Sequence, residues 1–188
     1  MEFRQLKSQQ LRRKDKSNEQ AIDKAIRQLC EKINANKEYY TTSSCSGRIT
    51  ITKSMEEKST NAFLFKSHEK ISFSLVKKAL KNIDYTQLVY FKQEPCILHV
   101  ACKNMEKAKI LLDKAKFCGW KKAGIIPGKN RFVVEMLSTE KIELPIMNNG
   151  NILVDDYYLK LLVKEANRKL ARTREKIERL ERMINQKV

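Results

Sequence analysis

Residues 39–48, with the sequence YYTTSSCSGR, hold the densest group of chemically useful side chains in the chain. Five Ser or Thr residues, one thiol, one glycine and one arginine follow two tyrosines. Hydroxyl donors, the conformational freedom of Gly47 and the forked guanidinium of Arg48 suit an anionic ligand or one with many hydrogen-bonding groups. The alternative is a Ser- and Thr-rich turn at a strand end, whose hydroxyl groups satisfy only their own backbone.

The two histidines of the chain are candidate proton acceptors, because histidine exchanges a proton near neutral pH. His68 follows an alternating, strand-like segment, and binding loops often lie just beyond strand ends; the alternative is an ordinary surface histidine. His99 lies between Cys96 and Cys102, which are zinc-ligand types. On a strand, however, residues 96 and 102 share one face while residue 99 points to the other. We therefore predict a structural strand with one functional candidate, His99, and expect no metal.

Cys45 is a poor candidate for a catalytic nucleophile, a role that requires a nearby base and a reactive thiolate. Arg48 follows it after only two residues, so the Cys-x5-Arg phosphate loop of cysteine phosphatases does not fit. We expect Cys45 to pack or to contact a ligand. The five cysteines are an odd number, and no apolar run approaches the roughly 18 residues of a membrane span. We expect reduced thiols in a cytoplasmic protein without a membrane partner.

The elements that must position these residues can be read from hydrophobic periodicity and from turn residues. A capping box at 17–20 is expected to open the first main helix, and Asp23, off the apolar stripe of that helix, is a candidate for orienting a site residue. Helices are expected over residues 21–33, 74–81, 105–118 and within 152–188, and strands over residues 49–52, 63–66, 86–92, 96–103, 123–126 and 132–137.

This order of elements predicts an α+β fold, with a mixed or antiparallel sheet, flanking helices and a long basic C-terminal helix. We expect a single domain over residues 1–188, with a break at Pro145 and at residues 148–151 before the C-terminal helix. Residues 1–16 form a basic N-terminal arm, which is either a short helix or a segment ordered on RNA.

The net charge of +17 is the strongest compositional signal. Such a charge opposes compaction, and a polyanion such as nucleic acid relieves the repulsion; the alternative is a generally basic, soluble protein. Between residues 160 and 187, Lys and Arg outnumber Glu by ten to four. We expect Arg172 and Arg179 to contact RNA. The apolar seam of this helix could form a coiled-coil dimer, but we favour packing on the domain and a monomer.

The run at residues 39–48 resembles the hallmark of the tRNA wybutosine-synthesising methyltransferases that act at the N4-methylation step. Further markers follow the order seen in that family: Asp23, the pair at 33–34, His68, the segment 97–102, Gly119-Trp120, Gly124-Ile125 and the segment 166–169. One departure is the segment before the His68 strand, which reads STNAF at residues 59–63 where many relatives are rich in glycine.

The resemblance implies methyl transfer from S-adenosylmethionine to the N4 ring nitrogen of a tricyclic guanosine derivative, beside the anticodon of phenylalanine tRNA. It implies that His68, or failing it His99, takes the proton from the acceptor nitrogen. Without the resemblance, the absence of Gly-x-Gly-x-x-Gly and Walker sequences would stop the interpretation at a basic nucleic-acid-binding α+β domain. A tRNA-binding module without catalytic activity is the second hypothesis.

The remaining roles in the hydroxyl-rich run are assigned on the same basis. Ser44, Ser46 and the Gly47 backbone are expected to hold the methyl donor's carboxylate or the edge of the base, and Arg48 to pair with that carboxylate or an RNA phosphate. Ser43 and Cys45 are expected to face the tRNA base. Tyr39 and Tyr40 either stack on an unpaired base or are core residues of a strand, where their side chains point to opposite faces.

Overall fold

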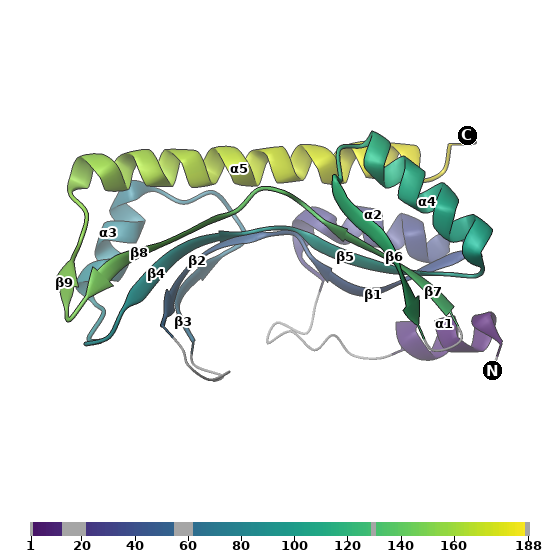
Figure 1. Ribbon diagram of the computed structural model, residues 1–188, viewed down its shortest axis with the longest axis horizontal. Helices are drawn as coiled ribbons and strands as arrows, with labels where there is room; N and C mark the ends of the chain where they lie inside the picture. The colour runs from purple at the N-terminus through teal and green to yellow at the C-terminus, as the bar shows by residue number, and fades with distance from the viewer. Residues whose placement is uncertain (1, 13–21, 55–61, 129–130, 187–188) are drawn as a thin grey trace. The chain divides into compact units, whose positions relative to one another are not determined.

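The computed structural model of the protein describes residues 2–12, 22–54, 62–128 and 131–186 (Figure 1). The chain divides into two compact units, the first with residues Met1–Ser46, Cys96–Thr139 and Thr173–Val188, the second with residues Gly47–Pro95 and Glu140–Arg172. In chain order the elements are α1 (Phe3–Leu11), α2 (Lys24–Ala35), β1 (Tyr39–Cys45), β2 (Arg48–Lys53), β3 (Phe63–Ser67), α3 (Phe73–Lys81), β4 (Val89–Glu94), β5 (Ile97–Cys102), α4 (Met105–Phe117), β6 (Lys122–Gly128), β7 (Arg131–Leu137), β8 (Ile142–Asn148), β9 (Asn151–Ile152) and α5 (Asp156–Met183).

The first unit is built on a four-stranded antiparallel sheet in the order β1-β5-β7-β6. Its main core lies on one face of this sheet, where α2, α4 and the end of α5 contribute apolar residues at three- and four-residue spacing. Trp120 is fully buried there, and its indole N–H donates to the Lys176 carbonyl over 3.3 Å. A smaller cluster on the other face comprises Phe3 and Leu6 of α1 with Tyr40, Ala101 and Val133.

The second unit contains a five-stranded antiparallel sheet in the order β3-β2-β4-β8-β9. Alternate residues of its strands, such as Ile49, Ile51 and Phe91, form a core with α3 and with the part of α5 before residue 173. Side-chain caps define the helix starts: the Ser72 hydroxyl accepts from the Leu75 amide, and the Asp155 carboxylate accepts from the Tyr158 amide. No helix within the described ranges has the length and apolar composition that crossing a bilayer requires.

The predicted α+β class, the antiparallel pairing and the long basic helix are confirmed, with the strands divided between two sheets. The helix predicted over residues 105–118 is observed as α4, and the Asn104 side chain caps its start by accepting from the Lys107 amide over 3.0 Å. Of the two interpretations of the N-terminal arm, the helix is the one observed. The capping box at 17–20 lies outside the described residues, and α2 begins only at Lys24, so the predicted start was too early.

The predicted break at Pro145 is wrong, because Pro145 lies inside β8. A proline is tolerated there because β9 pairs only with Met147 and Asn148, so β8 has a single neighbour, β4, at this position. The register between β4 and β8 also shifts beside this pair, between Val89 and Tyr90. A proline in a strand with one open side removes no ladder hydrogen bond on that side.

Candidate active site

The hydroxyl-rich run is mostly strand rather than turn. Residues 39–45 form β1, and only Ser46 and Gly47 separate it from β2. The expectation of a loop at a strand end therefore applies to two residues instead of ten. Gly47 has a φ angle of +82°, which side chains with a Cβ rarely adopt, so a glycine is needed at this junction.

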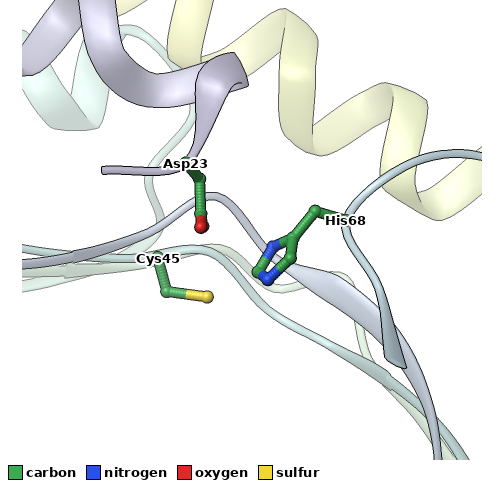
Figure 2. A group of neighbouring side chains, drawn as sticks. All are labelled: Asp23, Cys45 and His68. Atoms are coloured by element: carbon green, nitrogen blue, oxygen red, sulfur yellow. The ribbon is translucent and has the colours of Figure 1, made fainter. Parts of the chain in front are cut away.

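Ser46 is fully buried and held from two sides. One carboxylate oxygen of Asp23 accepts hydrogen bonds from the Ser46 amide at 2.7 Å and from its hydroxyl at 3.0 Å. The guanidinium of Arg174 donates to the Ser46 carbonyl. Figure 2 shows the Asp23 side chain just before α2 and the Cys45 side chain at the end of β1. These contacts favour a positioning role for Ser46 over the direct ligand contact expected from the sequence, and they give Asp23 the orienting contact that was expected.

His68 follows β3 directly, as predicted, and its imidazole is drawn in Figure 2. The His68 Nδ1 atom lies 3.2 Å from the carbonyl oxygen of Gly47. A carbonyl can only accept, so this contact assigns the N–H to Nδ1, and in the neutral ring Nε2 then carries the lone pair. The geometry thus gives His68 the tautomer of a proton acceptor at Nε2.

The loop after His68 is fixed to α5 by a two-way hydrogen bond. The Asn167 amide group donates to the Ile71 carbonyl over 2.7 Å, and its oxygen accepts from the Ile71 amide over 2.9 Å. Ile71 is buried, at 5% exposure, so both of its backbone groups depend on this partner. Asn167 therefore limits the movement of the segment that carries His68.

Arg48 is held by an ion pair between its Nε and the carboxylate of Glu94. Its guanidinium carbon also lies 4.6 Å from the centroid of the Phe63 ring, within cation–π range. The Nε contact uses one of the five N–H donors of the guanidinium. With about a quarter of each partner exposed, 27% for both side chains, the pair orients the guanidinium without burying it.

Tyr39 and Tyr40 are core residues, which decides between the two interpretations of this pair. Tyr39 is 6% exposed and donates its hydroxyl to the Lys107 carbonyl over 3.1 Å, and burial raises its pKa to about 12. Tyr40 is fully buried, contacts Phe3 at a ring-centroid distance of 5.1 Å, and accepts from Arg131 over 3.0 Å. Neither ring is available to stack on a base.

His99 takes part in a cross-strand row on β5, with Ser43 of β1 and Glu135 of β7 as its direct partners. Its Nε2 lies 3.0 Å from a Glu135 carboxylate oxygen. Cys96 and Cys102 belong to the core on the other face, as the alternation of the strand predicted. Burial raises the pKa of the Cys102 thiol to about 12 and that of Cys96 well above its usual range.

The other predicted contact residues have accessible side chains. Ser43 is exposed, and Ser44 and Cys45 are half-buried on β1. Arg172 and Arg179 are both exposed on α5, and Arg179 lies 3.7 Å from the Glu175 carboxylate, a weak surface pair. Their exposure is compatible with the ligand and RNA contacts expected from the sequence, and these contacts stay proposals.

Sequence reasoning missed the residues that hold the site in place. Asn34 accepts from the Thr41 amide over 2.8 Å and so ties the start of β1 to α2. Arg174, Glu94 and Asn167 hold Ser46, Arg48 and Ile71 respectively. The available signals are weak: in the sequence Asn34 and Asn167 stand out only as family markers, and Arg174 is one cation among many on a basic helix.

Comparison with known proteins identifies the family. The family model described as "Methyltransferase TYW3" matches residues 3–186. The tRNA(Phe) 7-((3-amino-3-carboxypropyl)-4-demethylwyosine(37)-N(4))-methyltransferase of Archaeoglobus fulgidus is 37% identical over 187 residues, covering 98% of this chain and 94% of that protein. The tRNA wybutosine-synthesizing protein 3 homolog of Xenopus laevis is 34% identical, covering 94% of this chain and 72% of its own length.

A solved structure is similar as well. The PH1069 protein from Pyrococcus horikoshii superimposes with a TM-score of 0.82 at 36% sequence identity, covering 88% of this chain and 87% of that chain. The agreement in fold and the match of the family model to residues 3–186 confirm the resemblance that the hydroxyl-rich run indicated. The chain therefore belongs to the TYW3 methyltransferase family.

Proposed function

We propose that the protein transfers a methyl group from S-adenosylmethionine to N4 of 7-(3-amino-3-carboxypropyl)-4-demethylwyosine at position 37 of tRNA(Phe). The observation that carries this proposal is the match of the family model to residues 3–186, together with relatives that are named for this reaction. The net charge of +17 fits a polyanionic substrate. The alternative of a binding module without catalysis has no comparable support.

The reaction places limited demands on the protein. When bound, S-adenosylmethionine supplies a methyl group activated by a sulfonium sulfur. As the new N–C bond forms and the C–S bond breaks, N4 gives up its proton, and alignment of the two partners supplies much of the rate. We assign the proton to His68 Nε2, because the Gly47 carbonyl holds the N–H of the ring at Nδ1.

The methyl donor carries a carboxylate, and Arg48 has the chemistry to pair with it. Its guanidinium is partly exposed, oriented by Glu94 and supported by the ring of Phe63. Ser44 and the Gly47 backbone complete the proposed donor contacts, with Ser43 and Cys45 toward the base. Ser46 acts indirectly, since its backbone groups and hydroxyl are engaged by Asp23 and Arg174.

The test is methyl transfer from labelled S-adenosylmethionine to tRNA(Phe) that carries the N4-unmethylated tricyclic base, beside the same tRNA without that base. The proposal expects label only in the first. Donor binding without transfer would mean a different acceptor, and tRNA binding without donor binding would favour the binding module.

Two matched variants test the base. His68→Ala should lower turnover by about 10²- to 10⁴-fold, the usual contribution of a general base, with tRNA affinity nearly unchanged. His99→Ala, which removes the partner of Glu135 on the other sheet, should leave turnover near that of the unaltered protein. A larger loss of turnover in His99→Ala than in His68→Ala would assign the role of general base to His99.

A further inference from the structure

The sheet of the second unit has one face that carries its core and one that does not. Ile49, Ile51, Val89 and Phe91 point into the core with α3 and α5. By strand alternation, the residues between them point to the other face. We call this the open face; its residues are Arg48, Thr50 and Thr52 of β2, Phe63 and Lys66 of β3, Tyr90, Lys92 and Glu94 of β4, and Glu143 and Pro145 of β8.

One cross-strand row on the open face consists mainly of rings. Thr52 pairs with Phe63 on one side and with Tyr90 on the other, and Tyr90 pairs in turn with Pro145. Register shifts fall beside this row, between Ile51 and Thr52 and between Val89 and Tyr90, so Phe63 departs from the alternation of β3. Its ring lies on the open face because the Arg48 guanidinium is 4.6 Å from its centroid. Phe63 is 43% exposed, whereas phenylalanine is among the residue types most often fully buried.

The neighbouring row is charged. Thr50 pairs with Lys66 and with Lys92, and Lys92 pairs with Glu143, to which its ammonium group forms an ion pair at 2.8 Å. Lys92 joins the two rows, because its ammonium group lies 5.4 Å from the Tyr90 ring centroid. A second cation, Arg48, which pairs with Glu94 in a further row, lies above the Phe63 ring. Tyr90 and Lys92 are two residues apart on β4, roughly 7 Å along the strand, and Phe63 and Lys66 are three residues apart on β3.

Two hydroxyl groups between these rows have no protein partner in the described chain. The Thr50 side chain is fully buried and that of Thr52 is 5% exposed, yet neither Oγ1 makes a hydrogen bond within the described residues. An unsatisfied buried hydroxyl costs free energy, and few are found in folded proteins. The side chains that flank Thr50 in register are the flexible lysines at 66 and 92.

We propose that the open face binds an unpaired stretch of the tRNA substrate, with bases on Phe63 and Tyr90 and phosphates on Lys66 and Lys92. An exposed ring and a partly exposed ring beside cations on an antiparallel sheet suit single-stranded RNA, since every base has a face that stacks and every nucleotide a negative charge. An acidic protein segment would use the cations but not the paired rings. The identity of the RNA as the tRNA substrate rests on the proposed function. The location of the binding site on the open face does not.

The experiment compares three variants in direct binding to tRNA(Phe) over a series of salt concentrations. Phe63→Leu/Tyr90→Leu removes the rings and keeps apolar, strand-compatible side chains. Lys66→Gln/Lys92→Gln removes two charges. Tyr157→Leu is the control, because Tyr157 is 80% exposed on α5, which packs on the opposite face of the sheet.

The ring variant should bind tRNA at least ten-fold more weakly, with an unchanged salt slope, since removing one stacked base weakens binding by roughly 5- to 150-fold. The lysine variant should reduce the salt slope by about one for each phosphate that is no longer neutralised. The Tyr157 variant should bind like the unaltered protein. Thermal melting verifies that each variant folds. If Phe63→Leu/Tyr90→Leu does not fold, the single variant Phe63→Leu replaces it.

Ring and lysine variants that bind tRNA within two-fold of the unaltered protein would overturn the proposal. So would a weakening in the Tyr157→Leu control that equals the weakening in the ring variant. The readout is binding and not methyl transfer. A protein that binds tRNA through this face but transfers no methyl group would therefore refute the proposed function while sustaining the site.

Discussion

The two-way hydrogen bond between Asn167 and the Ile71 backbone gives a sharp test of how the His68 segment is held. Asn167→Ala removes both bonds and leaves a buried amide and a buried carbonyl without partners. Each orphaned group costs about 1–3 kcal/mol. We therefore expect the free energy of unfolding to fall by roughly 2–6 kcal/mol, and the melting temperature by about 4–24 °C at this chain length.

A second variant separates the two bonds. Asn167→Asp keeps an oxygen for the Ile71 amide but replaces the donor to the Ile71 carbonyl with a second carboxylate oxygen, which repels that carbonyl. The variant should therefore be at least as destabilising as the loss of one of the two bonds. Arg168→Ala is the control, because the neighbouring Arg168 makes only an exposed pair with Glu165, which solvent screens. Urea titration followed by circular dichroism measures all three. The reasoning fails if Asn167→Ala is no more destabilising than Arg168→Ala.

Charges and thiols give three further predictions. A hydrogen bond from Lys141 is the main cause that lowers the pKa of Glu143 to about 2 from 4.5, so its contribution to stability is present above pH 4.5 and disappears as the pH falls toward 2. Glu143→Gln should therefore lower the melting temperature at pH 7 but not at pH 2. Native protein should react with a thiol reagent mainly at Cys45, which is half-buried while the other four thiols are buried; labelling that is equal at all five would contradict the structure. Charge reversal at Arg172 and Arg179 should flatten the salt dependence of tRNA binding, and an unchanged slope would remove α5 from the RNA contact.

Much of the fold could be predicted because the signals are local. The stripe of apolar residues in α4, its Asn104 cap and the glycine that follows it lie within one short segment, and the helix begins and ends as expected. The strand that ends before His68 was also recognised from its alternation. These features depend on period and on turn chemistry, which a single sequence displays directly.

The errors occur where the deciding partner is distant in the sequence. The residues of β1 read as a polar turn because serines and threonines are common in turns. They form a strand because β5 pairs along the whole segment, more than fifty residues later. Pro145 was interpreted as a break because a proline usually interrupts a strand. Only the pairing of β8 with its neighbouring strands shows that one side of β8 is open at Pro145.

The candidate site was predicted in its composition but not in its construction. His68 and the hydroxyl-rich run were found, whereas the contacts of Ser46 with Asp23 and Arg174 join residues 23 and 128 positions apart. No periodicity connects such residues, and a carboxylate on a helix looks the same in sequence whether it is solvated or holds a buried serine.

At the junction of Ser46 and Gly47, the backbone conformation of a single glycine determines two contacts of the site. The Ser46 carbonyl accepts from Arg174, and the Gly47 carbonyl lies against His68 Nδ1, so two consecutive carbonyl groups each orient a different cation or ring. The directions of both carbonyls depend on the positive φ angle at Gly47. A residue with a Cβ would cost about 1–2 kcal/mol in that conformation, and relaxing to a negative φ would turn the carbonyl away from His68. The tautomer that we assign to the proton acceptor thus depends on a backbone angle that glycine alone adopts readily.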